Sequence, residues 1–223
     1  MGRPAACLFD LDGLLLDTEP LHADAWQQAA THFGRPLSAD ELLMLRGRRR
    51  HDCADQVRQW IGDSGRPAPS REQLLAVRQP IAEALLVHAA PMPGAPDLVQ
   101  HCAAEGIPMA MATSSSKAAV ELKASPHPWL SLIAVRVHGD DPQLKRGKPA
   151  PDVFLLAAER LGVQASGCWA FEDSPAGVQA AAAAGCLVHV LPPDHLNEAE
   201  RQLLYPGMER FLSSLADVLG ALQ

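Results

Sequence analysis

The second part of the chain alternates short apolar runs with segments of helical periodicity. This pattern predicts helices over 95–105, 116–123, 151–161 and 174–184, and strands over 108–113, 131–137, 168–171 and 187–191. Strands that are joined by single helices run parallel, and their right-handed crossovers cover both faces of the sheet with helices. The sequence therefore predicts an α/β fold with a doubly wound parallel sheet.

One strand and a helical block precede this alternation. Residues 5–11 form an apolar run that ends in Asp-Leu-Asp-Gly, which is typical of a buried parallel strand where it meets solvent. From 21 to 89 apolar residues recur at helical spacing, and Ser70 with Gln73 fits a capping box. We therefore predict two parts: a core of residues 1–16 and 91–223, and an all-helical cap of residues 17–90 inserted after the first strand.

The charge balance limits the classes of partner. The 223 residues include 19 Lys and Arg against 26 Asp and Glu, a formal net charge of −7. Nucleic acids and anionic membrane surfaces attract clustered positive charge, so this balance argues against both as partners. No apolar run approaches the ~18 residues of a membrane span, and the N-terminal residues do not fit a secretory signal. We expect a cytoplasmic protein and a monomer, with a dimer as the alternative.

Acidic side chains follow two of the predicted strands. Asp10 and Asp12 come after the first strand, and Glu172 and Asp173 come after the strand at 168–171. Ligands of doubly wound sheets bind outside the carboxyl ends of the strands. The carboxylates of Asp10 and Asp12, two residues apart, repel each other unless a cation lies between them or one is protonated. The pattern indicates a hard cation such as Mg²⁺, acid/base chemistry, or both, and a solvated turn is the alternative for Asp10 and Asp12 alone.

Hydroxyl groups and one lysine complete this set. Thr113 and Ser114 end the strand at 108–113 beside a helix N-terminus, whose free N–H groups suit a phosphate oxygen. Taken alone, these hydroxyls are more simply interpreted as a helix cap. Lys148 precedes two prolines that fix the backbone ahead of a helix. Because all these groups fall at one edge of the predicted sheet, they indicate a site that holds a phosphoryl group beside an aspartate free to attack it.

Four motifs follow one another along the chain: Phe9-Asp10-Leu11-Asp12-Gly13, Thr113-Ser114, Lys148 in Gly-Lys-Pro-Ala-Pro-Asp, and Phe171-Glu172-Asp173-Ser174. In this order they resemble the motifs of the haloacid dehalogenase superfamily, in its branch of phosphatases and phosphomutases with a helical cap. The resemblance extends from Leu8 to about Val190. It implies a Rossmann-like core with an inserted helical cap.

The resemblance also implies a role for each motif. Asp10 would be the nucleophile that forms an aspartyl-phosphate, and Asp12 would protonate the leaving oxygen and then deprotonate water. Thr113 and Ser114 would bind phosphoryl oxygens, and Lys148 would neutralise their charge. The ligands of Mg²⁺ would be Asp10, Asp12 through its main-chain carbonyl, Glu172 and Asp173. The charge on Asp10 is expected to favour the protonated Asp12 that the acid step needs.

Four cap residues resemble substrate-facing or hinge positions of related sugar-phosphate mutases, namely His22, Arg46, Gly47 and Arg50. A guanidinium group suits a second phosphate or sugar hydroxyls, and a solvated basic turn is the alternative. We predict an Mg²⁺-dependent phosphatase of small phosphorylated metabolites, sugar or nucleoside monophosphates, similar in local motifs to the subgroup that includes pseudouridine 5'-phosphatase. A β-phosphoglucomutase-type mutase is the alternative enzyme. The inserted cap and the second acid, Asp12, disfavour a phosphorylation-controlled binding module of the receiver type.

Overall fold

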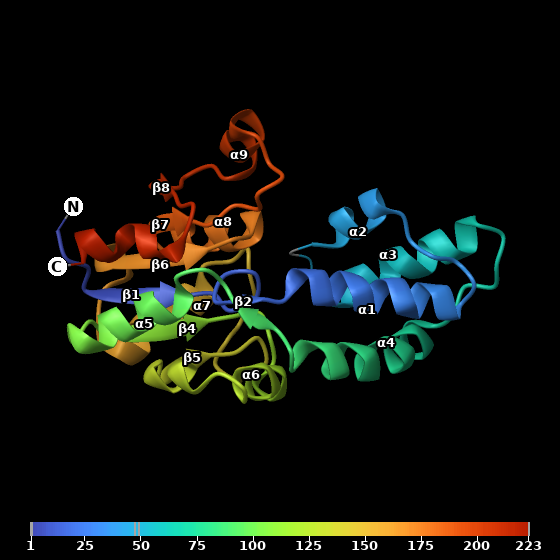
Figure 1. Cartoon of the computed structure of the whole chain (residues 1–223), viewed down its shortest axis with the longest axis horizontal. Coiled ribbons are helices and arrows are strands. Elements are labelled where there is room, and N and C mark those ends of the chain that lie inside the picture. The colour runs from blue at the N-terminus through green and yellow to red at the C-terminus, as the bar shows by residue number, and fades with distance from the viewer. Residues whose placement is uncertain (1, 47, 49, 223) are drawn as a thin grey trace. The chain divides into compact units, whose positions relative to one another are not determined.

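The computed structural model describes residues 2–46, 48 and 50–222, and the chain divides into two compact units (Figure 1). Unit 1 comprises Met1–Asp17 and Ala90–Gln223, and unit 2 comprises Thr18–Ala89. The chain leaves unit 1 through β2 (Leu16–Asp17) and re-enters it through β3 (Ala90–Pro91), and these two strands pair antiparallel. Each unit has a hydrophobic core of its own.

Unit 1 is built on a parallel sheet, which has six strands among the described residues. In spatial order they are β5 (Val135–Val137), β4 (Met109–Ala112), β1 (Ala6–Phe9), β6 (Cys168–Glu172), β7 (Leu187–Val190) and β8 (Arg210–Phe211). From the central β1 the chain continues to β4 and β5 on one side, and then to β6, β7 and β8 on the other. The predicted doubly wound α/β fold is confirmed, and β1 lies at the switch point where such sheets bind ligands.

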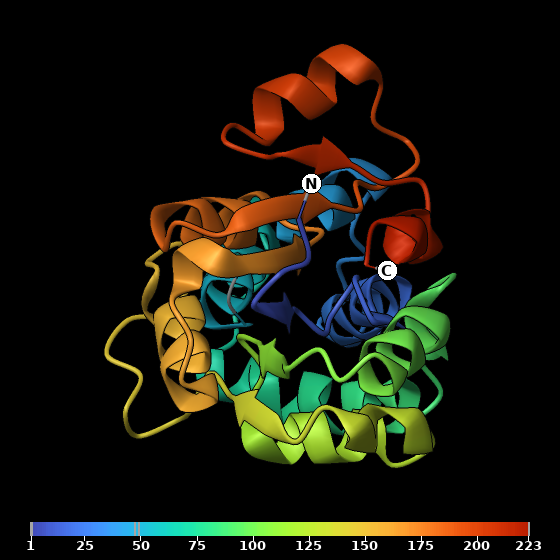
Figure 2. The same cartoon turned by 90° about the vertical axis from the view of Figure 1, so that its left-hand side faces the viewer.

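Helices cover both faces of this sheet. They are α5 (Ala95–Ala104), α6 (Lys117–Ala124), α7 (Asp152–Leu161) and α8 (Pro175–Ala183), with 3-10 turns η1 (Pro128–Leu132), η2 (Ala165–Gly167) and η3 (Leu215–Ala221). The helix α9 (Glu198–Leu204) follows β7 in the chain and has no buried residue. Ala6 and Leu8 of β1 pack in a core with α7 and α8, whereas Cys7 meets Cys102 of α5 on the other face. Figure 2 shows the yellow and orange α7 and α8 on one side of the sheet and the green α5 on the other. A strand covered on both faces is apolar throughout, which explains the continuous apolar run of β1.

The strand predicted over 131–137 is wrong in its first half. Only β5 is a strand there, and residues 131 and 132 belong to the 3-10 turn η1. Pro128 stands at the start of this turn, and its fixed φ favours the turn conformation. Leu130 and Ile133 are both buried at a spacing of three residues, which suits the period of a 3-10 turn rather than a strand. The elements α9, β8 and η3, which follow β7, are not among the predicted helices and strands.

Unit 2 consists of α1 (Glu19–His32), α2 (Ala39–Leu45), α3 (Arg50–Asp63) and α4 (Arg71–Leu86). Its core gathers side chains from all four helices, including Trp26, Leu45, Val57 and Leu74. The capping box predicted at α4 is confirmed, because the Ser70 hydroxyl accepts from the main-chain N–H of Gln73 and the Gln73 side chain accepts in return. None of the described helices is both long and apolar enough to cross a membrane.

A buried histidine lies in β7. The side chain of His189 is 1% exposed, and within the described ranges neither ring nitrogen has a hydrogen-bond partner. Its ring stacks on Phe171 with centroids 5.2 Å apart and meets Trp169 at 4.7 Å. Desolvation by burial, helped by the charge of Arg210, lowers the pKa of His189 to about 4. The imidazole is therefore neutral in the folded protein at pH 7.

Replacing His189 with leucine is expected to weaken the pH dependence of stability on the acid side. The unfolded chain takes up a proton near pH 6.5 and the folded chain only near pH 4, so the free energy of unfolding falls as the pH falls through this window. The loss approaches about 3 kcal/mol at the acid end. Urea denaturation between about pH 7 and about pH 4.5 measures how the free energy of unfolding changes with pH in the wild type and in the variant. Parallel slopes for the two proteins would contradict the assignment.

Candidate active site

Asp10 lies at the carboxyl end of the central strand β1. Its main-chain N–H donates to the Phe171 carbonyl at 3.1 Å, which extends the β1–β6 ladder by one residue and fixes the backbone at this point. The residue is buried, and burial raises the pKa of Asp10 to about 7 against the lowering effect of the Lys148 ammonium. Full ionisation of Asp10 at neutral pH therefore requires further positive charge nearby.

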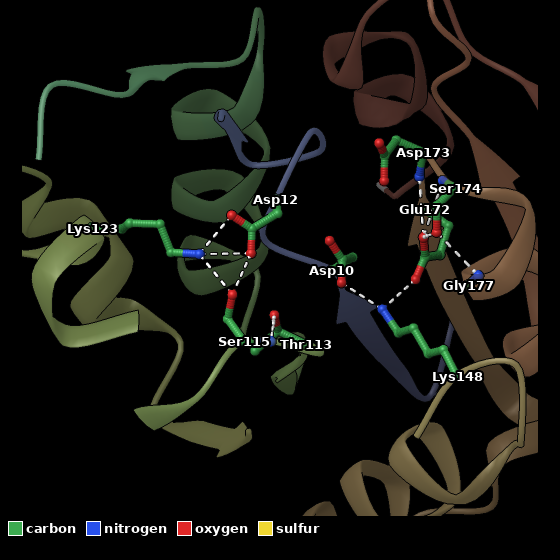
Figure 3. A network of polar contacts seen from close by, with 10 residues as sticks. All are labelled: Asp10, Asp12, Thr113, Ser115, Lys123, Lys148, Glu172, Asp173, Ser174 and Gly177. Carbon is green, nitrogen blue, oxygen red and sulfur yellow. Dashed lines mark hydrogen bonds and ion pairs between the residues drawn. The ribbon is translucent and has the colours of Figure 1, made fainter. Parts of the chain in front are cut away.

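Lys148 joins two acidic strand ends. Its Nζ donates to Asp10 Oδ1 and to Glu172 Oε1, each at 2.5 Å (Figure 3). Burial lowers the pKa of Lys148, but the charges of Asp10 and Glu172 raise it above the ordinary value for lysine. Removing one member of such a buried group leaves a charge without compensation. The three side chains thus form one electrostatic unit at the end of β1 and β6.

Glu172 ends β6 and is fully buried. Its Oε2 accepts from the Asp173 N–H at 3.2 Å and from the N–H and hydroxyl of Ser174 at 3.3 Å and 3.1 Å. The carboxylate packs against α8 at residue 177, which is glycine. A Cβ at Gly177 would lie 2.0 Å from Glu172 Cδ. Both oxygens of Glu172 are therefore fixed, one by Lys148 and one by the start of α8.

Three carboxylates can each direct one oxygen to a common point. The ligand atoms of Asp10, Glu172 and Asp173 lie within 4.8 Å of one another, and they form the acidic group that the described ranges offer for a metal ion. An all-oxygen donor set fits a hard divalent cation such as Mg²⁺. The single Lys148 ammonium does not balance three negative charges, and a divalent cation would. The side chain of Asp12 does not belong to this group.

Thr113 and Ser114 follow β4 at the same edge of the sheet. The Thr113 N–H donates to the Val137 carbonyl at 3.1 Å, and its hydroxyl accepts from the Ser115 N–H at 3.0 Å. This leaves the Thr113 hydroxyl proton for an acceptor oxygen, and Ser114 is exposed. A Cβ at Gly139 would lie 2.1 Å from the Ser114 carbonyl oxygen, so glycine allows the loop after β5 to close on this turn.

Asp12 has partners that are separate from those of Asp10. Lys123 Nζ lies 2.5 Å and 2.6 Å from its two carboxylate oxygens, and the Ser115 hydroxyl donates to Oδ2 at 2.7 Å (Figure 3). The expectation that Asp10 favours a protonated Asp12 omitted this ammonium, which stabilises the carboxylate. These contacts favour the ionised form of Asp12, and the protonated form that the acid step needs stays a prediction.

Lys123 is not among the predicted site residues, although its spacing carries a signal. The side chain is 1% exposed in the last turn of α6, where lysines usually face solvent. Buried Val120 precedes it by three residues, which places Lys123 on the buried face of α6. Ser115 belongs to a run of hydroxyl residues, and the sequence does not show which of them caps the helix and which belongs to the site. In the structure the N-cap of α6 is Ser116, whose hydroxyl accepts from the Ala119 N–H.

The predicted basic residues of the cap lie in unit 2 with polar partners. Arg46 ends α2 and pairs with Glu19, with Nε and Oε2 3.2 Å apart. Arg50 begins α3 and donates to Gln79 Oε1 at 3.2 Å. Gly47 lies outside the described residues. A substrate role for these positions stays a prediction.

His22 contacts an arginine that the sequence analysis missed. Arg78 Nη2 lies 2.9 Å from His22 Nδ1, and the guanidinium carbon lies 4.7 Å from the centroid of the Trp26 ring. Arg78 is buried on the same face of α4 as Leu74 and Ala82, at a spacing of four residues. This spacing is the signal that distinguishes Arg78 from the surface arginines of unit 2.

Sequence comparisons find relatives along nearly the whole chain. A family model described as haloacid dehalogenase-like hydrolase matches residues 4–185. A probable pseudouridine-5'-phosphatase of Drosophila melanogaster is 36% identical over 215 residues, which cover 95% of this chain and 90% of the relative. A fructose-1-phosphate phosphatase of Escherichia coli is 36% identical over 188 residues, which cover 82% of this chain and 94% of the relative.

Solved structures share the fold of the whole chain. The crystal structure of CbbY from Rhodobacter sphaeroides with phosphate matches with a TM-score of 0.78 and 26% identity, over 96% of each chain. A putative β-phosphoglucomutase from Thermotoga maritima matches with a TM-score of 0.79 and 27% identity, over 100% of this chain and 98% of the other. The similarity thus includes both units.

Proposed function

Because this chain belongs to the haloacid dehalogenase-like hydrolases, we propose that it is an Mg²⁺-dependent phosphatase that acts on small phosphorylated metabolites through an aspartyl-phosphate. One observation carries the proposal: the Asp10 carboxylate lies against the Lys148 ammonium, beside the acidic ends of β6. A phosphate monoester is anionic, so a carboxylate attacks it only where positive charge offsets the repulsion. Lys148 supplies one positive charge, and the carboxylates beside it are ligands for a metal cation that would supply more.

Asp10 acts as the nucleophile in the first half of the reaction. Lys148 holds Oδ1 and leaves Oδ2 to attack the phosphorus. As this P–O bond forms, the ester P–O bond breaks, and its electron pair goes to the leaving oxygen, which takes a proton from Asp12. Thr113 and the Ser114 N–H donate to the phosphoryl oxygens. The products are the free alcohol and an aspartyl-phosphate on Asp10.

Water completes the cycle in the second half. Its oxygen attacks the phosphorus while Asp12 accepts a proton, and the P–O bond to Asp10 breaks. This step restores the Asp10 carboxylate and releases inorganic phosphate. Asp12 must be ionised at this point, and its contacts with Lys123 support that form.

The residues at the ends of β1 and β6 fit Mg²⁺. Asp10, Asp173 and the main-chain carbonyl of Asp12 would hold it, with Glu172 completing the acidic group. When bound, the ion supplies positive charge that polarises the phosphoryl group. Glu172 also keeps Lys148 in place through its Oε1, so the cation site and the nucleophile depend on the same side chain.

We propose that unit 2 selects the substrate. His22, Arg46, Gly47 and Arg50 are the residues assigned to this role, and guanidinium groups recognise phosphate or vicinal hydroxyl oxygens. The relatives are named for pseudouridine 5'-phosphate and fructose 1-phosphate, which are hydroxyl-rich molecules with one phosphomonoester. This chain is expected to take substrates of the same class. Its cytoplasmic location and its monomeric state stay predictions.

Phosphate release from a panel of monoesters tests the proposed function. We expect release from sugar or nucleoside monophosphates in the presence of Mg²⁺, loss of activity with EDTA, and recovery when Mg²⁺ is added in excess. A phosphodiester of the same alcohol is the matched control and is expected to resist hydrolysis. Hydrolysis that is unaffected by EDTA would contradict the metal assignment, and no release from any monoester would contradict the phosphatase.

A mutase is the second candidate, and the match to a putative β-phosphoglucomutase favours it. A mutase would return the phosphoryl group to the sugar instead of transferring it to water. The products separate the two activities. Glucose 1-phosphate converted to glucose 6-phosphate with little free phosphate would indicate the mutase. Release of one phosphate for each monoester consumed would indicate the phosphatase.

A further inference from the structure

The network of Asp12, Ser115 and Lys123 contains two side chains to which the reaction steps above assign no role. We propose that Lys123 is a positioning residue that, together with Ser115, holds the Asp12 carboxylate in the orientation that activates water. The step concerned is hydrolysis of the aspartyl-phosphate. This inference rests on the proposed function, because it presupposes that Asp10 is phosphorylated.

The geometry fixes the plane of the carboxylate as well as its position. Lys123 Nζ contacts both oxygens of Asp12, at 2.5 Å and 2.6 Å, so rotation about the last side-chain bond would lengthen at least one contact. The Ser115 hydroxyl adds a third contact at 2.7 Å and itself lies 2.8 Å from Lys123 Nζ. A carboxylate held by three contacts has few orientations left, which is what an efficient general base requires.

The same network is attached to the turn proposed to bind phosphate. The Ser115 N–H donates to the Thr113 hydroxyl at 3.0 Å, and the Ser115 carbonyl accepts from the Gly139 N–H at 2.8 Å. Ser115 therefore connects Asp12 with the residues assigned to the phosphoryl oxygens. Because Ser115 contacts both, it fixes the orientation of Asp12 relative to the residues that would bind the phosphoryl group.

Burial distinguishes the two members of the ion pair. The Lys123 side chain is 1% exposed, whereas that of Asp12 is 19% exposed. The ammonium is enclosed by the protein, whereas part of the Asp12 side chain is exposed to solvent. Burying an ammonium without a charged partner is strongly unfavourable, and Asp12 provides that partner for Lys123.

This role makes a prediction that is specific to one step. An activated aryl phosphate such as p-nitrophenyl phosphate has a leaving group that needs no proton, so it phosphorylates Asp10 without acid catalysis. Hydrolysis of the aspartyl-phosphate still needs Asp12 as base: the water oxygen bonds to phosphorus, its proton goes to Asp12, and the bond to Asp10 breaks. A loss of positioning should therefore slow the second step and spare the first.

The test uses the full-length Lys123→Met variant with p-nitrophenyl phosphate and Mg²⁺. We expect kcat to fall roughly tenfold to a hundredfold, within the range of general base catalysis. The initial burst of p-nitrophenol should persist, and the fraction of enzyme trapped as aspartyl-phosphate by acid quenching should rise above that of the wild type. Lys117→Met, at an exposed position of the same helix, is the matched control and should leave both quantities unchanged.

A double-mutant cycle separates positioning from a merely structural contribution. If Lys123 acts through Asp12, Lys123→Met in an Asp12→Asn background should cause no further loss of kcat, and additive losses would overturn the inference. If Lys123→Met does not fold, Ser115→Ala carries the test, with a smaller rise in trapped aspartyl-phosphate; an unchanged fraction would overturn it. Wild-type enzyme that forms no aspartyl-phosphate would instead contradict the proposed function.

Discussion

Asp10→Asn is expected to abolish phosphate release. The amide occupies the same space as the carboxylate, but its oxygen is a poor nucleophile and forms no aspartyl-phosphate. Removing the nucleophile from a group of residues that act together lowers kcat by at least about 10⁴-fold. Steady-state phosphate release measures the loss, and acid quenching should recover no phosphorylated protein.

The same substitution should leave the fold intact. Burial raises the pKa of Asp10 to about 7, so the folded protein accommodates a neutral side chain there readily, and Lys148 keeps its contact with Glu172. Circular dichroism and thermal unfolding check this point. Asp97→Asn makes the same chemical change at an exposed residue of α5 and should keep full activity. Substantial turnover by Asp10→Asn, with deamidation excluded by mass spectrometry, would contradict the nucleophile assignment.

The meeting of Asp10 and Glu172 could be predicted because it follows from topology, whereas Lys148 reaches them from the long connection between β5 and α7. In a parallel sheet the residues after each strand lie at one edge, whatever the details of packing. The apolar runs locate the strands, with Asp10 directly after β1 and Glu172 as the last residue of β6. No side-chain direction had to be known. The structure accordingly brings together residues that are more than a hundred positions apart in the chain.

The partner of Asp12 could not be deduced in this way. Lys123 lies at the far end of α6, and whether it reaches Asp12 depends on the packing of that helix and on the rotamer of a long side chain. Arg78 and His189 raise a related difficulty, because spacing in the sequence can mark a position as buried but does not identify the side chains that contact it. The error in the first half of the strand predicted over 131–137 has a local cause, since apolar residues at a spacing of three or four fit a turn as well as a strand.

Gly177→Ala should be strongly destabilising, although it replaces a glycine within a helix. In a helix interior this change usually stabilises by up to about 1 kcal/mol, because alanine is the better helix former. At Gly177 the new Cβ would lie 2.0 Å from Glu172 Cδ and Oε1, so the Glu172 carboxylate would have to move. Glu172 is fully buried and its carboxylate oxygens contact Lys148 and Ser174, so moving the carboxylate would break these contacts. We expect the free energy of unfolding to fall by about 3 kcal/mol through overpacking and strain on the buried ion pair.

The effect on activity should exceed what lower stability explains. Moving Glu172 separates its Oε1 from Lys148 and changes the acidic group beside Asp10, so the variant should need more Mg²⁺ for half-maximal phosphate release even where it is fully folded. Gly62→Ala in α3 is the control, because its Cβ would lie 3.5 Å from Ala68 Cβ, an ordinary contact. Urea denaturation and Mg²⁺ titration of activity measure both effects. A Gly177→Ala protein with wild-type stability and Mg²⁺ requirement would show that Glu172 is not held as the structure places it, since the glycine is what leaves room for that carboxylate.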